Sequence, residues 1–274
     1  MPELPEVETI VRYLRPEIRG KRILDVWSNT PRLFRGGRFS KVKKEILGAR
    51  IRGISRLGKN IIFHLSNGRD LLIHLMMTGK LLWSPKNIRE PHIRFWMKLS
   101  GGDVLALHDI RKFGLIRLFS GSPTSRGKSD FQKINLGPDA LSLSFEMFEG
   151  ILGEHRGAVK NLLMNQKIIS GIGNIYSDEI LWYAGIKPTR RIDTWSEKKI
   201  RKLFLAMHKV LNLAIKKEGT TSRDYRKPDG SEGGYYEIRK VYQREGERCA
   251  RDGATIQRVK IGQRSTYFCP RHQK

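Results

Sequence analysis

The hydrophobic pattern changes near the middle of the chain, and this change limits the possible folds more than any other feature. Between about residues 22 and 119, short apolar or alternating runs are separated by tight-turn signals such as Asn67-Gly68 and Gly101-Gly102. Such turns join antiparallel strands, so we expect an antiparallel β-sandwich or flattened barrel in the first half. Apolar residues at helical spacing dominate the second half, and the chain is therefore expected to be an α+β protein.

Helical periodicity also occurs at the very start of the chain. An apolar stripe at spacings of three and four predicts a helix that ends before Gly20, and it consists of Leu4, Val7, Val11, Leu14 and Ile18. Further helices are expected near residues 144–151, 157–167, 174–184 and 195–217. Thr194 and Glu197 predict a capping box at the start of the last one. The tail from Val241 is expected to be a small β unit that carries both cysteines.

These patterns divide the chain into five segments. We expect a β-sandwich domain with its helix at residues 1–119, a polar linker at 120–130, a helical domain at 131–218, a long loop at 219–238 and a cysteine-bearing hairpin at 239–274. A loop of this length is usually either functional or disordered, and its composition leaves both open. Because it is polar and rich in glycine, we expect it to bury too little apolar surface to order itself and to be mobile without a ligand.

The charge balance indicates a polyanionic partner. Lysine and arginine number 53 against 27 aspartates and glutamates, which gives a formal net charge of +26. Nucleic acid is favoured over an anionic membrane because no basic amphipathic helix dominates the sequence. No apolar run approaches the ~18 residues of a membrane helix, and the acidic first residues do not resemble a secretory signal. Two cysteines, Cys249 and Cys269, are too few for a disulfide scaffold and fit a reducing cytoplasm.

The N-terminus carries a candidate nucleophile. Pro2 follows Met1, and a small second residue permits removal of the methionine. A terminal amine has a pKa of about 8, well below that of lysine, so much more of it is unprotonated and nucleophilic at neutral pH. A secondary amine can condense with a sugar aldehyde carbon to an iminium. Glu3 and Glu6 share a helix face and could trade protons with that centre. The alternative is that Pro2 opens a helix whose dipole the two glutamates complement.

A series of motifs spread along the chain carries the most specific functional signal. In order, they are MPELPEVET, RLGKNIIFHL, LLIHLMMTG, DIRKFG, LGPDAL, KNLLMNQKIISGIGNIYSDEILWYAGIKP and GQRSTYFCP. Together they resemble bacterial formamidopyrimidine-DNA glycosylase over nearly the whole length. Sister enzymes of the endonuclease VIII type, which act on oxidised pyrimidines, usually open with glycine where this chain has Leu4. The resemblance therefore favours the branch that acts on oxidised purines.

The resemblance implies which residues carry the chemistry. Pro2 would be the nucleophile, with Glu3 as its proton-transfer partner and Glu6 beside them. Lys59 of RLGKN would assist the sugar chemistry, although by its position alone it would be a solvated lysine at a hairpin end. Arg264 of GQRST would hold the phosphate next to the lesion and assist the second elimination.

Base removal from a duplex also requires that the nucleotide leave the stack and that another group fill the gap. Met77, Arg111 and Phe113 match the family's inserted residues, and a thioether, a guanidinium and an aromatic ring suit that task. Without the resemblance, Met77 and Phe113 would be interpreted as core residues.

Phosphate binding is implied for the glycine-rich segment KIISGIGNIY, which opens a helix. Backbone amides at a helix N-terminus, together with the Asn174 side chain, can hold a phosphate, although a tight helix–helix turn explains the glycines equally well. By resemblance, the segment belongs to a helix–two-turn–helix DNA-binding domain, with Lys160 as a second phosphate ligand. His92 and Arg156 are weaker candidates for the same role.

By resemblance, the long loop closes over an everted purine. Four backbone amides would then donate to the oxygen of the damaged base, and these belong to Ser222, Arg223, Asp224 and Tyr225. A disordered connector is the alternative.

The C-terminal segment resembles a zinc finger with an altered ligand set. The family's usual finger has two C-x-x-C pairs, whereas here the pairs are Cys249 with Asp252 and Cys269 with His272, with sixteen residues between them. The spacing fits a zinc ribbon, and carboxylate oxygen and imidazole nitrogen both bind zinc, so one structural zinc ion is expected. The alternative is that the metal is lost and the cysteines are small buried hydrophobes.

Taken together, the resemblance implies an N-terminal antiparallel β-sandwich with an N-terminal helix, and a C-terminal helix–two-turn–helix domain with a zinc-finger β-hairpin. The expected protein is a monomeric, cytoplasmic, nucleoid-associated DNA glycosylase and abasic-site lyase that needs no organic cofactor. Its substrate would be double-stranded DNA that contains oxidised purines or abasic sites. Two alternatives stay open, namely a glycosylase for oxidised pyrimidines and a DNA-damage binder without catalytic activity.

Overall fold

The computed structural model describes residues 1–84, 88, 90–120, 134–192 and 195–274. They form two compact units, of which unit 1 is Met1–Asn135 with Lys217–Gly234, and unit 2 is Leu136–Lys216 with Tyr235–Lys274. Most of the expected linker, residues 121–130, lies outside the described part of the chain. No helix in the described part is long and apolar enough to cross a membrane.

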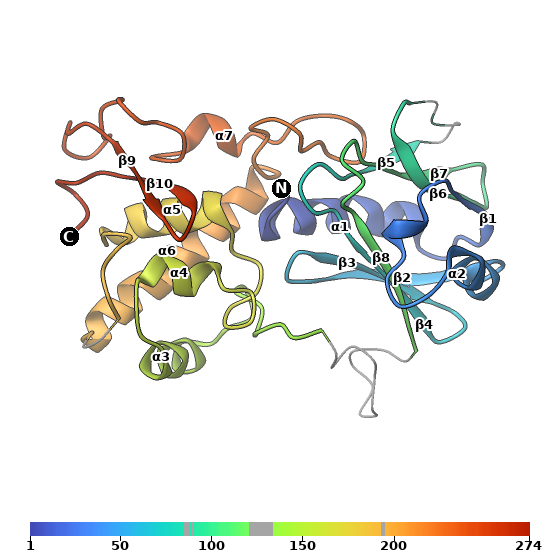
Figure 1. Cartoon of the computed structure of the whole chain (residues 1–274), viewed down its shortest axis with the longest axis horizontal. Coiled ribbons are helices and arrows are strands. Elements are labelled where there is room, and N and C mark those ends of the chain that lie inside the picture. Colours follow the sequence, from blue (N-terminus) through green and yellow to red (C-terminus); the bar gives the residue numbers. More distant parts are fainter. Residues whose placement is uncertain (85–87, 89, 121–133, 193–194) are drawn as a thin grey trace. The chain divides into compact units, whose positions relative to one another are not determined.

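Within the described residues, unit 1 contains two four-stranded antiparallel sheets (Figure 1). The first has the order β1 (Ile23–Ser28), β6 (Ile93–Leu99), β7 (Val104–His108), β5 (Lys80–Ser84). The second has the order β2 (Ile51–Leu57), β3 (Asn60–Leu65), β4 (Arg69–His74), β8 (Leu115–Ser120). The turn η1 (Pro31–Leu33) and helix α2 (Phe39–Ile46) connect β1 to β2. The expected antiparallel β-sandwich is therefore confirmed.

The two tight turns named above join consecutive strands, as their residue types predict. Gly68 ends the β3–β4 turn with φ +77°, and Gly101 and Gly102 form the β6–β7 turn with φ +91° and +90°. Residues with a side chain rarely adopt this left-handed conformation, so glycine sets the position of each hairpin.

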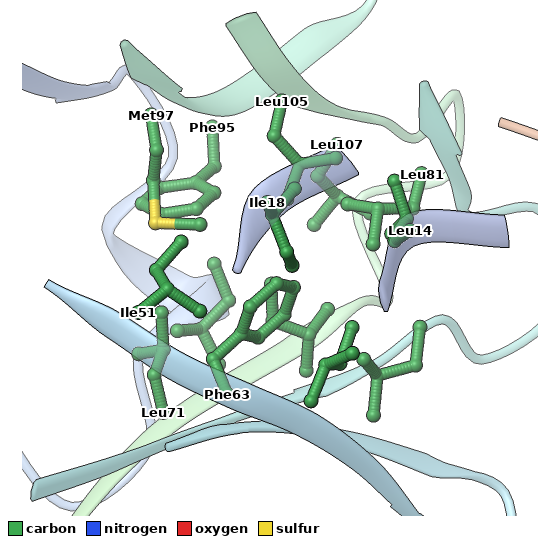
Figure 2. Close-up of a cluster of buried hydrophobic side chains, with 14 of the residues drawn as sticks. Leu14, Ile18, Ile51, Phe63, Leu71, Leu81, Phe95, Met97, Leu105 and Leu107 are labelled. Atoms are coloured by element: carbon green, nitrogen blue, oxygen red, sulfur yellow. The ribbon is translucent and has the colours of Figure 1, made fainter. Parts of the chain in front are cut away.

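Helix α1 (Leu4–Ile18) supplies much of the core of unit 1, and every residue of its predicted stripe is buried. Figure 2 shows Leu14 and Ile18 meeting side chains from both sheets, among them Phe63 of β3 and Phe95 of β6. Each such side chain stabilises the fold by about 1.5–3 kcal/mol when it leaves water. The helix ends where predicted, because Gly20 follows with φ +81°.

Unit 2 is mainly helical, as expected. Its helices are α3 (Phe145–Glu154), α4 (Val159–Met164), α5 (Asn174–Ala184), α6 (Glu197–Lys216) and α7 (Tyr235–Ile238). The hairpin of β9 (Gln257–Ile261) and β10 (Arg264–Phe268) confirms the predicted β unit near the C-terminus. The predicted capping box cannot be assigned to α6, because Thr194 lies outside the described residues.

The segment between α6 and α7 packs on unit 1, which contradicts the expectation that it buries too little to order itself. The Tyr225 side chain is 6% exposed and belongs to the core of unit 1. The N–H of Trp83 in β5 donates to the carbonyl of Pro228 at 2.8 Å, and the N–H of Gly234 donates to the carbonyl of Lys217 at 2.8 Å. The polar composition of the segment did not indicate that Tyr225 is buried or that the backbone forms these hydrogen bonds. The end of the expected loop is helix α7.

Candidate active site and DNA-contact residues

Pro2 lies before the first helix and does not begin it. Helix α1 starts at Leu4, with Glu3 as its N-cap and Pro5 in its first turn. The interpretation of Pro2 as a helix-opening proline is therefore wrong. Pro2 is buried, whereas Met1 is exposed and accessible for removal. Removal of Met1 would convert the Pro2 nitrogen from an amide into a secondary amine.

The Glu6 carboxylate connects the start of α1 to the start of the loop. Its Oε2 accepts the N–H of Glu3 at 2.7 Å, and its Oε1 accepts the N–H of Thr220 at 2.7 Å. Glu3 and Glu6 are 3% and 1% exposed. Charge-assisted bonds in a buried site are strong, so Glu6 holds the start of the loop to the residue that follows Pro2. The sequence indicated its proximity to Pro2 but not its contact with Thr220.

Gly219 and Tyr225 complete this junction. Gly219 has φ +87°, and a Cβ there would lie 3.0 Å from Glu6 Cγ and Oε1 and 3.0 Å from Tyr225 Cε1. The Tyr225 hydroxyl donates to the Glu218 carbonyl at 3.2 Å. Burial and then the negative charge of Glu6 raise the pKa of Tyr225. Tyr225 therefore anchors the loop through its side chain, a role that its polar sequence context did not reveal.

The other three predicted lesion-reading residues directly precede this anchor. Ser222 and Asp224 are half-buried and Arg223 is exposed. The carbonyl of Arg223 accepts a hydrogen bond from Arg226 at 3.0 Å. Their contact with a damaged base stays a prediction.

Lys59 occupies the turn between β2 and β3, directly after Gly58, which has φ +57°. It is 6% exposed, so the alternative of a solvated hairpin lysine is wrong. Burial and then the nearby Lys59 ammonium lower the pKa of His74 to about 4. The neutral ring accepts the N–H of Met76 at its Nδ1, at 2.9 Å. Sequence analysis missed His74, although the motif LLIHLMMTG contains it.

Met77, Arg111 and Phe113 lie together on the surface of unit 1. Met77 is 43% and Phe113 is 45% exposed. Arg111 Nη1 is 3.4 Å from Met77 Sδ, and the Arg111 guanidinium carbon is 4.5 Å from the centre of the Phe113 ring. The alternative of core packing is therefore wrong for Met77 and Phe113. A thioether and an aromatic ring exposed side by side are suited to enter a base stack.

Asp109, which sequence analysis missed, holds the segments that carry these side chains. It is fully buried, and its two carboxylate oxygens accept the Thr78 hydroxyl and the Gly114 N–H, each at 2.7 Å. Its N–H donates to the carbonyl of His92, whose Nδ1 lies 3.0 Å from Arg94 Nη2. The predicted phosphate ligand His92 is thus exposed, and its backbone is bound to the segment that begins at Asp109 and carries Arg111 and Phe113.

Lys160 does not reach the surface, so the prediction that its side chain binds a phosphate is wrong. Its side chain is fully buried, and Nζ donates to Asp178 Oδ1 and to the Thr266 hydroxyl, each at 2.7 Å. Burial raises the pKa of Asp178 to about 7, although Lys160 opposes the shift. Asp178 Oδ2 accepts the N–H of Tyr267 at 3.0 Å. The buried pair ties α4 and α5 to β10.

Asn174 begins α5 as predicted, but its side chain faces the hairpin. The carboxamide nitrogen donates to the Ser265 carbonyl at 3.0 Å, and the buried Oδ1 has no hydrogen-bond partner within the described part of the chain. Arg156, which follows α3, is exposed and donates through Nη1 to the Gly153 carbonyl at 2.8 Å. Phosphate binding by Asn174 and Arg156 stays a prediction.

Arg264 stands exposed at the first position of β10. It pairs with Ile261 across the hairpin turn. The three residues after it are bound by Asn174, Lys160 and Asp178, as described above. Unit 2 therefore holds β10 through residues 265–267, and Arg264 stands beside the hairpin turn.

Three of the four predicted zinc ligands lie together. The ligand atoms of Cys249, Asp252 and Cys269 all lie within 4.8 Å of one another. Cys269 Sγ is 3.3 Å and 3.4 Å from the two Asp252 oxygens. Tetrahedral zinc, with bonds of about 2.3 Å to sulfur and 2.0 Å to oxygen, separates such ligands by about 3.5 Å, so these residues fit the metal. Burial raises the pKa of the Cys269 thiol to about 11, and zinc would displace that proton.

His272 lies apart from these three residues, so its role as the fourth zinc ligand stays a prediction. Its Nε2 lies 2.8 Å from the Trp182 carbonyl, and the two rings pack 5.4 Å apart. Its backbone N–H donates to Cys269 Sγ at 3.3 Å.

These features together are those of a DNA glycosylase. They are a proline before the first helix of a β-sandwich, the exposed group of Met77, Arg111 and Phe113, and a hairpin with metal ligands on a helical unit. Family profiles agree along the chain. The formamidopyrimidine-DNA glycosylase N-terminal domain matches residues 1–116, the H2TH domain of that enzyme matches 136–226, and the zinc finger found in FPG and IleRS matches 246–273. The chain belongs to the formamidopyrimidine-DNA glycosylase family.

Relatives and solved structures match over the full length. Formamidopyrimidine-DNA glycosylases of Streptococcus mutans and Solibacter usitatus are 35% and 38% identical, each over 100% of both chains. A Lactococcus lactis FPG mutant bound to Fapy-dG-containing DNA superposes with a TM-score of 0.89 at 35% identity, over 100% of both chains. The Lactococcus lactis enzyme bound to abasic-site DNA has a TM-score of 0.88 at 34% identity, over 99% of both chains.

Proposed function

We propose that this chain excises oxidised purines, such as 8-oxoguanine and formamidopyrimidines, from duplex DNA and then cleaves the strand at the abasic site. The observation that carries the proposal is the buried pair Glu3 and Glu6 directly after Pro2, in the same unit as the buried Lys59. The Lactococcus lactis complexes with Fapy-dG and abasic DNA support both the substrate and the lyase step. We further propose that the protein works on the nucleoid, because its substrate would be genomic DNA.

The chemistry follows from the amine that removal of Met1 creates. The Pro2 nitrogen forms a bond to C1′ of the damaged nucleotide, the bond from C1′ to the base breaks, and the base leaves with the electron pair. Glu3 supplies the proton that the sugar ring needs to open, and the product is an iminium between Pro2 and C1′. In β-elimination a base removes a proton from C2′, and the C3′–O bond breaks as the 3′ phosphate leaves with the electron pair. In δ-elimination a proton is lost from C4′, and the C5′–O bond breaks in the same way. Lys59 and Arg264 stabilise the phosphates that depart.

We propose that the surface cluster of unit 1 replaces the extruded nucleotide. Met77 fills the vacated space, Phe113 wedges between base pairs, and Arg111 donates to the orphaned partner base. The backbone amides of residues 222–225 contact the oxidised base, while His92, Arg156 and the turn before Asn174 bind phosphates.

Borohydride reduction tests the proposal directly. A duplex with 8-oxoguanine opposite cytosine should yield a covalent adduct at Pro2 with the full chain. Pro2→Gly should bind the same duplex but excise the base far more slowly, because a primary amine replaces the secondary one. Adducts only with oxidised-pyrimidine duplexes would assign the chain to the pyrimidine branch. Lesion-specific binding without any adduct would leave a non-catalytic binder.

Cys249, Asp252 and Cys269 would hold zinc, and the bound ion would cross-link the C-terminal segment. This cross-link would keep the hairpin and its Arg264 in place. Elemental analysis should find one zinc per chain, and Asp252→Cys should bind it more tightly. A fully active preparation without metal would overturn this proposal.

A further inference from the structure

Three side chains in the second sheet of unit 1 form a hydrogen-bonded chain that the glycosylase reaction does not use. Ser55 lies in β2, His64 in β3 and Asp70 in β4. Ser55 Oγ is 2.7 Å from His64 Nε2, and His64 Nδ1 is 2.8 Å from Asp70 Oδ1. Successive side chains of a strand face opposite sides, and Phe63 lies in the core. His64 therefore faces away from the core.

The partners of the His64 ring favour one tautomer of its neutral form. An ionised Asp70 can only accept hydrogen bonds, so the hydrogen of a neutral imidazole lies on Nδ1. The Nε2 lone pair then faces Ser55, whose hydroxyl donates to it. Nucleophile, base and orienting carboxylate thus stand in the order of a Ser-His-Asp triad, which is recognised by geometry rather than by sequence position.

The surroundings add two observations. The Asp70 side chain is 5% exposed, and its buried Oδ2 has no hydrogen-bond partner among the residues that the structure describes. A buried carboxylate oxygen without a donor lowers stability, so sheet packing alone does not favour aspartate here. Gly53 lies opposite His64 on the neighbouring strand and has no side chain. A Cβ added at Gly53 would still be 4.0 Å from the imidazole Cδ2. The ring is therefore open toward that edge of the sheet.

We propose that Ser55, His64 and Asp70 form a second reactive site that transfers acyl groups from small, reactive esters to Ser55. Ser55 Oγ forms a bond to the acyl carbon while His64 Nε2 takes its proton. The ester C–O bond then breaks, and the leaving alcohol receives that proton. Water attacks the acyl-serine by the same route, which releases the carboxylic acid and restores the serine.

The exposure of the triad limits its substrates. Ser55 is half-buried and the His64 side chain is 29% exposed, so the site is shallow and suits small donors. Activation of the hydroxyl by a positioned base accelerates such reactions by about 10²–10⁴-fold. The expected activity is thus slow turnover of aryl acetates rather than hydrolysis of a large bound substrate.

Labelling with an alkyl fluorophosphonate, mapped by mass spectrometry on the full chain, tests the proposal. Ser55 should be labelled, Ser55→Ala should not react, and His64→Gln should react about 100-fold more slowly. Ser66→Ala is the matched control, because this half-buried serine accepts the Arg50 N–H and lies on the adjacent turn. It should react like the wild type.

p-Nitrophenyl acetate gives an independent readout, with a burst of nitrophenolate that Ser55→Ala abolishes. Cleavage of abasic DNA and the melting temperature should be unchanged in Ser55→Ala, which separates loss of the triad from misfolding and from failure of the glycosylase proposal. No label on Ser55, or equal labelling of Ser55 in His64→Gln, would overturn the proposal and leave the three residues as a cross-strand structural network.

Discussion

Replacement of Glu6 by glutamine tests the junction between α1 and the loop. The two oxygens of Glu6 accept the buried N–H groups of Glu3 and Thr220, each at 2.7 Å. Glutamine has nearly the same shape but only one acceptor oxygen, so its NH₂ group must face one of these donors. One buried N–H then loses its partner, which costs about 1–3 kcal/mol.

The expected loss is visible in both stability and catalysis. The melting temperature of unit 1 should fall by about 2–4 °C for each kcal/mol. Single-turnover excision of 8-oxoguanine should slow by about 10–100-fold, because 1.4 kcal/mol corresponds to a factor of ten. Glu17→Gln removes the same charge from an exposed position of α1 and should change neither quantity.

A second substrate shows which hydrogen bond is lost. If Thr220 loses its acceptor, cleavage at a pre-formed abasic site should be nearly normal, because no base remains for the loop to contact. If Glu3 loses its acceptor, both reactions should slow together, because the proton-transfer residue itself moves. Wild-type melting and wild-type excision in Glu6→Gln would refute the inference that this carboxylate couples the two segments.

Three further changes probe the surrounding structure. Gly219→Ala should lower the melting temperature and slow excision more than Gly230→Ala. Both have φ near +87°, but among the described residues only an added Cβ at Gly219 would have neighbours within 4 Å, and equal effects of the two changes would exclude the close approach. Burial lowers the pKa of His74 to about 4, so its contribution to stability is complete above pH 6.5 and is lost as the pH falls toward 4. The melting temperature of His74→Asn should depend less on pH over that range than that of the wild type. The same pH dependence in both proteins would contradict the lowered pKa of His74. Lys160→Ala should destabilise unit 2 by about 3–5 kcal/mol in urea unfolding, because it leaves Asp178 buried and unpaired, whereas Lys160→Met combined with Asp178→Leu should recover most of the loss. A Lys160→Ala variant that is stable but binds DNA weakly would instead restore its role as a phosphate ligand.

Local patterns in the sequence were sufficient for most of the architecture. The apolar stripe from Leu4 to Ile18 and the glycine turns at Gly68 and Gly101 depend on residues within a few positions of one another, so their spacing alone predicts helix and hairpin. The same is true of Cys249 and Asp252, whose spacing places two metal ligands on one turn. Motif resemblance then identified Pro2, because the chemistry of a terminal amine depends on its place in the chain.

Only the tertiary structure decided what the polar and charged residues do. Lys160 was expected to face DNA but is buried, because Asp178 and Thr266 lie eighteen and more than a hundred residues away in the chain. Tyr225 sits in a polar segment, yet it anchors that segment in the core of unit 1. Glu6 meets Thr220 across 214 positions. Hydrogen bonds and ion pairs depend on distances of about 3 Å between atoms that the fold brings together. Hydrophobic periodicity is local, so it does not predict these long-range contacts.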